Sequence, residues 1–189
     1  MAQVTGILCQ VITGNVDGAG TDGRVYLGLG AREFRMDSSA DDYERGSWRE
    51  YLIGHPPVEP DPNNIPGQQI RVLNGPRNDP RDVGFPIDRL NLSKTPVYIR
   101  FEPSGSSPDW NLAFVAVLVY APQFAVAYAP PDPNNFHSLW LGDNYGKVLY
   151  LPEYFAQGLL ETAAREGRLE AAAQEVLEIG RKRAEGYKS

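Results

Sequence analysis

The chain is poor in cysteine and histidine. Its 189 residues contain one cysteine, Cys9, and two histidines. A single cysteine excludes an intramolecular disulfide framework and a zinc site built from several cysteines. Cys9 lies in an apolar run, so we expect a small, buried, unreactive side chain.

The chain also lacks a basic excess and a long hydrophobic run. Its formal net charge is −6 and its pI is near 5.0. A nucleic-acid-binding protein would need a clustered basic face, so we expect no nucleic-acid partner. No apolar run approaches the roughly 20 residues of a transmembrane helix. The N-terminus resembles no secretory signal, which predicts a cytoplasmic protein or one exported without such a signal.

Residues 1–151 have the composition of a β domain, with glycine, proline, tyrosine and valine in short apolar runs broken by turns. The pattern predicts strands at Val4–Thr13, Gly23–Leu29, Glu33–Met36, Trp48–Ile53, Gln69–Val72, Pro96–Phe101, Asn111–Tyr120, Phe124–Tyr128, Ser138–Leu141 and Lys147–Leu151. Asn111–Tyr120 is apolar at nearly every position, so we expect a central strand, covered on one side by the C-terminal segment.

Two proline-rich connections, His55–Gly67 and Ala129–Asn135, interrupt this pattern. Proline excludes them from central strands, so we expect surface loops. The first opens a segment, residues 55–95, that we interpret as an insertion.

Residues 152–189 are rich in alanine, glutamate, leucine and arginine, which predicts an amphipathic helical extension. Pro152 suits a first helical turn. The apolar positions recur at helical spacing: Phe155, Leu159, Leu160, Ala163, Leu169, Ala173, Val176 and Leu177. Two interpretations stay open, a helix packed on its own domain and a helix that binds a second copy or another protein.

Two acidic, glycine-rich loops, Asp17–Gly23 and Asp37–Gly46, bracket the second and third predicted strands. Carboxylates, carbonyls and flexible glycines are what Ca²⁺ needs in a site. Aspartate, glycine and serine are also ordinary turn formers. Composition alone therefore leaves both a calcium site and simple turns open.

The order of motifs resembles that of a PLAT domain. The resemblance rests on Thr13-Gly14, on the GAGTDG turn ending at Gly23, on Val25-Tyr26 and on the DDYERG segment at residues 41–46. A second block, VYIRFEPSGSSPDWNLAFVAV from Val97, matches the later strand, the glycine-bearing loop and the corner at Pro108 and Trp110.

The resemblance implies an all-β antiparallel sandwich of about eight strands that binds membranes or proteins, often with Ca²⁺, and carries no chemistry. It implies that Trp110 and Tyr26 are core residues. It implies a Ca²⁺ cofactor held at up to three sites: Thr21 (carbonyl), Asp22, Asp41 and Asp42; Asp37, Ser38, Ala40 (carbonyl) and Asp42; and Gly18, Gly20 and Asp109.

Motifs of catalysis are missing. His55 and His137 lack metal-ligand spacing, and the chain has neither a G-x-S-x-G elbow nor a phosphate-binding loop. We therefore expect a binding protein, not an enzyme. One hypothesis is Ca²⁺-assisted binding of a membrane, lipid or protein through loops at one end of the sandwich. The alternative is a structural or assembly protein that forms homo-oligomers or docks a partner through the sandwich face and residues 152–189.

Overall fold

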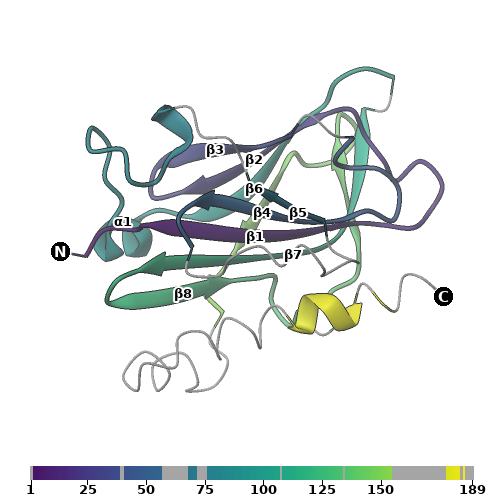
Figure 1. Ribbon diagram of the computed structural model, residues 1–189. Coiled ribbons are helices and arrows are strands. Elements are labelled where there is room, and N and C mark those ends of the chain that lie inside the picture. Colours follow the sequence, from purple (N-terminus) through teal and green to yellow (C-terminus); the bar gives the residue numbers. More distant parts are fainter. Residues whose placement is uncertain are drawn as a thin grey trace.

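The computed structural model describes residues 2–38, 41–56, 68–71, 76–106, 108–133, 135–154, 178–183 and 185 (Figure 1). Within them, the chain forms a β-sandwich of two sheets, as predicted. Each predicted strand range coincides with a strand of the structure to within about three residues, an error typical of element boundaries.

The larger sheet is built around β1. Its order is β5-β4-β1-β7-β8, and β9 pairs with the beginning of β7. The strands are β1 (Gly6–Thr13), β4 (Trp48–Gly54), β5 (Gln68–Arg71), β7 (Asp109–Ala121), β8 (Phe124–Tyr128) and β9 (Leu139–Gly142). One pairing departs from the antiparallel prediction, because β5 runs parallel to β4.

The smaller sheet has the order β10-β6-β2-β3 and is antiparallel throughout. Its strands are β2 (Arg24–Leu29), β3 (Arg32–Met36), β6 (Val97–Glu102) and β10 (Val148–Leu151). Side chains alternate along β6, with Val97, Ile99 and Phe101 buried between the sheets.

Large side chains from both sheets fill the core. Trp110 is fully buried and donates its indole N–H to Thr13 Oγ1 at 3.0 Å, which joins β7 to the end of β1. Cys9 is buried, as expected, and burial raises the pKa of its thiol. The prediction for Tyr26 is wrong: Val25 and Leu27 point into the core, so Tyr26 lies on the outer face, under the Arg100 guanidinium.

The outer face of the larger sheet carries a second buried cluster that includes Leu8, Phe114 and Leu118. Residues 178–183 are helical and Ile179 packs against this cluster. The prediction that the C-terminal segment covers one side of β7 is thus confirmed for these residues. The predicted helix over residues 155–177 lies outside the described residues.

Residues 76–96 connect the sheets at the end of the sandwich where β1 begins (Figure 1). They contain a 3₁₀ turn, η1 (Pro76–Asn78), and a short helix, α1 (Arg89–Lys94), whose N-cap is Asp88. The backbone N–H of Val4 donates to the Ile87 carbonyl at 2.8 Å, which ties this segment to the start of the chain. None of the described helices has the length and apolar character needed to cross a bilayer.

Candidate functional site: the loop rim

The two acidic loops meet at the end of the sandwich where β1 finishes. The Thr21 N–H donates to the Tyr43 carbonyl at 3.3 Å, and the Gly46 N–H donates to the Gly14 carbonyl at 3.0 Å. Arg45 strengthens the contact, since its guanidinium donates to Asn15 Oδ1 at 3.0 Å and to Asp17 Oδ1 at 2.5 Å. These hydrogen bonds hold the two acidic loops together at one end of the sandwich.

Two further loops complete this end, which we call the loop rim: residues 14–23, 41–47, 103–106 and 143–147. Asp109 pairs with Gly142 where β7 and β9 meet, so the third and fourth loops leave the sheets side by side. The first loop approaches the third, because a Cβ on Gly105 would lie 3.3 Å from Asp22 Oδ2. In Figure 1 the first loop projects on the side opposite α1 and the N-terminus.

Most predicted calcium ligands of the second loop have partners within the protein. Asp42 is 5% exposed and accepts from the Ser38 N–H at 2.7 Å and the Ser38 hydroxyl at 2.8 Å. Asp37 pairs with Arg35. These contacts shape the turn that follows β3, which is the ordinary role of aspartate and serine in a loop.

Thr21 and Asp41, two further predicted ligands, also make hydrogen bonds within the protein. Thr21 is buried, and its hydroxyl accepts from the Gly23 N–H at 3.0 Å. Asp41 is exposed, and its carbonyl accepts from Arg49 at 3.1 Å. Across the described residues, no three His, Cys, Asp or Glu side chains gather to share a metal ion. Ca²⁺ binding at the residues named from the sequence stays a prediction.

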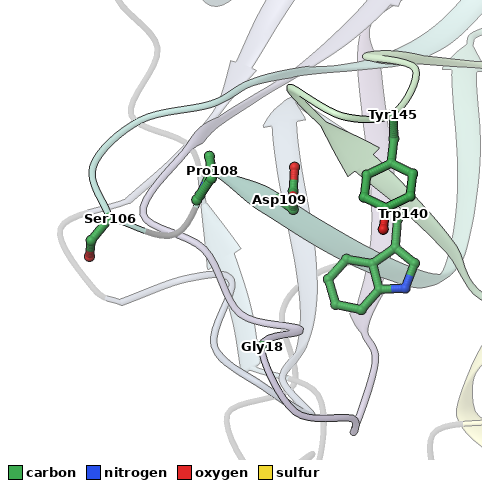
Figure 2. A pocket seen from close by; sticks show the side chains of 6 residues that line it. All are labelled: Gly18, Ser106, Pro108, Asp109, Trp140 and Tyr145. Atoms are coloured by element: carbon green, nitrogen blue, oxygen red, sulfur yellow. The ribbon is translucent and has the colours of Figure 1, made fainter.

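The predicted pairing of the first loop with Asp109 has a counterpart in the structure. A cavity of about 340 Å³ opens between the first, third and fourth loops, with Gly18 on one wall and Asp109 on another (Figure 2). Its remaining lining residues are Ser106, Pro108, Trp140 and Tyr145. Gly18 adopts a φ of +74°, a conformation that glycine accepts without strain.

Asp109 lines this cavity and also carries one unsatisfied carboxylate oxygen. That oxygen, Oδ1, is buried and has no hydrogen-bond partner among the described residues. A Cβ on Gly142 would lie 1.9 Å from it, so only glycine at that position leaves room for the carboxylate. A buried polar atom without a partner is costly, so this carboxylate is held in its place at the cavity by the packing around it.

Trp140 and Tyr145 form the aromatic side of the cavity (Figure 2). Their ring centroids are 6.1 Å apart and the angle between the ring planes is 23°. Trp140 pairs with Asn111 in the β7–β9 ladder, two residues along β7 from Asp109, so it stands on the same face of the sheet as Asp109. Tyr145 belongs to the turn after β9 and is 51% exposed.

Trp140 and Tyr145 were not predicted as site residues from the sequence. Their signal is weak: a tryptophan and a tyrosine stand on either side of a short glycine-bearing turn, Gly142-Asp143-Asn144. Only the pairing of β9 with β7 shows that this turn lies beside Asp109, more than 30 residues earlier in the chain.

No family model matches the chain, and no curated protein matches it. Solved structures resemble it distantly. Alpha toxin from Clostridium absonum superposes with a TM-score of 0.44 at 15% identity, covering 80% of this chain and 32% of the toxin. The variant Delta413-417:GS LOX gives 0.43 at 17% identity, over 91% of this chain and 20% of that protein. The same variant in complex with arachidonate gives 0.42 at 17% identity, with 79% and 16% covered. This chain thus spans about a third or less of each neighbour.

Proposed function

We propose that this chain is a non-catalytic binding module that docks on the lipid headgroups of a membrane through the loop rim. The observation that carries the proposal is the rim cavity, which Asp109 and the Trp140–Tyr145 pair line together. The lining residues include no histidine or cysteine and no basic side chain.

Exposed side chains around the cavity support a membrane as the docking surface. Val16, at the tip of the first loop, is 47% exposed, and Tyr145 is 51% exposed. Tryptophan and tyrosine have amphipathic rings that prefer the boundary between headgroups and hydrocarbon. The first loop, with Val16 exposed at its tip, would enter the same boundary region of the bilayer.

The acids of the rim determine which surface suits it. Asp22 and Asp41 are exposed there, and the whole chain carries a net charge of −6. A strongly anionic bilayer would repel such a surface unless Ca²⁺ bridged the two. A zwitterionic bilayer presents positive ammonium groups at its surface and requires no bridging ion.

Co-sedimentation with vesicles tests this function. The full chain is mixed with vesicles of phosphatidylcholine, with phosphatidylcholine containing phosphatidylglycerol, and with buffer alone, each with Ca²⁺ or with a chelator. We expect pelleting with phosphatidylcholine vesicles in chelator. Pelleting that appears only with Ca²⁺ and anionic lipid would support the predicted metal bridge in place of direct docking. Failure to pellet with every vesicle would refute the membrane function.

A matched pair of double variants identifies the end that docks. Val16→Ser with Tyr145→Ser removes apolar surface from the rim and is expected to reduce the pelleted fraction severalfold. Val83→Ser with Phe85→Ser removes apolar surface at the opposite end, where these side chains are 90% and 66% exposed. Both pairs are exposed, so folding should survive in each. A larger loss from the second pair would place the docking surface at the wrong end for our proposal.

A further inference from the structure

The rim cavity presents negative charge beside aromatic faces. Asp109 contributes the carboxylate, and Asp22 of the first loop lies close to Gly105 on the neighbouring loop. The nearest basic side chain of the fourth loop, Lys147, is engaged with Asp143 at 2.7 Å. A ligand that contacts the carboxylate of Asp109 in this cavity must therefore bring a positive charge or a hydrogen-bond donor of its own.

The aromatic wall narrows the choice to a positive charge. The face of an aromatic ring is the negative part of its quadrupole, so cations bind over it and anions do not. Trp140 is the ring type that binds cations best, and Tyr145 lies beside it at 6.1 Å. A cation here is attracted by two rings and by one carboxylate.

An organic cation fits this lining better than a metal ion does. Ca²⁺ takes six to eight oxygen ligands, whereas the side chains that line the cavity supply one carboxylate and the hydroxyls of Ser106 and Tyr145. An alkylated ammonium group has methyl groups that pack against ring faces and Pro108 while its charge is shared with Asp109. The volume of about 340 Å³ lies at the small end of ligand pockets, which suits a headgroup better than a whole lipid.

We infer that the rim cavity is a binding site for a quaternary ammonium group, of the kind that a choline headgroup carries. This inference rests on the proposed membrane function and adds a lipid preference to it. Phosphatidylcholine is recognised by charge and shape at Asp109, Trp140 and Tyr145. Free choline has the same chemistry and occupies the same site.

Calorimetric titration of the full chain with choline chloride, in chelator, tests the site. The matched probe is 3,3-dimethyl-1-butanol, which has the same shape without the charge. We expect saturable heat with choline and none with the neutral alcohol. Asp109→Asn and Tyr145→Ala should each weaken choline binding about tenfold or more, because each removes one source of attraction.

Glu44→Gln is the control variant, because it removes one negative charge from the loop rim at an exposed residue that does not line the cavity. It is expected to bind choline like the wild type. Tyr145 is half exposed, so Tyr145→Ala tests the site even if Asp109→Asn disturbs the packing against Gly142. Thermal unfolding of each variant identifies such a disturbance.

Equal binding of the neutral alcohol, unchanged affinity in Asp109→Asn and Tyr145→Ala, or no heat with choline would each overturn the inference. Vesicles separate it from the membrane function. Equal pelleting with phosphatidylcholine and phosphatidylglycerol, in chelator, would overturn headgroup recognition and leave membrane docking intact. Choline heat without pelleting on any vesicle would support the ammonium site and refute the membrane function.

Discussion

At the scale of single residues, charge pairs across strands organise the outer face of the smaller sheet. The Arg100 guanidinium on β6 donates to both carboxylate oxygens of Glu33 on β3, at 2.6 and 2.7 Å, across the intervening strand β2. The hydrogen bond from Arg100 is the main cause that lowers the pKa of Glu33 below its usual range. Both side chains are about one-third exposed, so solvent weakens the pair.

Glu33→Gln tests this pair by its pH dependence. Because the folded state lowers the pKa of Glu33, its stabilising contribution is present above the unfolded pKa, near 4.3, and is lost as pH falls through the folded value. At neutral pH the variant should be less stable by up to about 1 kcal/mol, a typical value for surface pairs. Denaturant unfolding at several pH values should show the two proteins converging below about pH 4. A constant difference down to acid pH would contradict this account.

Residue identity alone could not assign the roles of the rim aspartates. From the sequence, Asp37, Asp42 and Asp109 are all predicted calcium ligands. In the structure Asp42 accepts hydrogen bonds from Ser38, and Asp37 forms an ion pair with Arg35. One carboxylate oxygen of Asp109 has no partner among the described residues. The short-range contacts follow from turn chemistry. The environment of Asp109 depends on the pairing of β7 with β9, which local sequence does not encode.

At the scale of elements, short apolar runs broken by turns predicted the strands well, because each strand contributes buried apolar side chains and ends at a turn. β7 was predicted as a central strand from its continuous apolar run, and it pairs with β1, β8 and β9. The direction of β5 was not predictable, since alternation looks the same in parallel and antiparallel pairs. The helix α1 was also missed, because six residues are too few for a periodic signal.

The helical segment at residues 178–183 covers the second apolar cluster by close contact at Gly180. A Cβ there would lie 2.1 Å from Gln10 Oε1 and 3.2 Å from a ring carbon of Phe114. Arg183 adds a hydrogen bond to the Phe136 carbonyl at 2.7 Å. These residues pack on their own sheet. Homo-oligomer formation or partner docking through residues 152–189 stays a prediction.

Gly180→Leu should displace this segment, because the added side chain cannot fit against Gln10 and Phe114. We expect unfolding free energy to fall by about 1–3 kcal/mol, the usual cost of overpacking. Newly exposed apolar surface should increase the binding of a hydrophobic dye. Glu178→Ala, at an exposed position of the same segment, is the control and should match the wild type. Unchanged stability and dye binding in Gly180→Leu would show that the segment does not close on the sheet.

At the scale of the whole molecule, the sandwich separates two ends with different surfaces. The loop rim carries the acids, the cavity and the Trp140–Tyr145 pair, while the end near α1 exposes Val83 and Phe85. Two of the three tryptophans, Trp48 and Trp110, are buried, and Trp140 at the rim is partly exposed. Tryptophan emission that changes on contact with lipid therefore reports on one end of the molecule.

The most direct test of rim docking is quenching of this emission by phosphatidylcholine brominated along its acyl chains. The account predicts that vesicles of brominated lipid quench part of the wild-type emission, with unbrominated vesicles as the control. The Trp140→Phe variant keeps an aromatic ring at the rim and should still pellet with vesicles, yet lose the quenching. Absence of quenching in the wild type, or equal quenching in Trp140→Phe, would contradict docking through the loop rim.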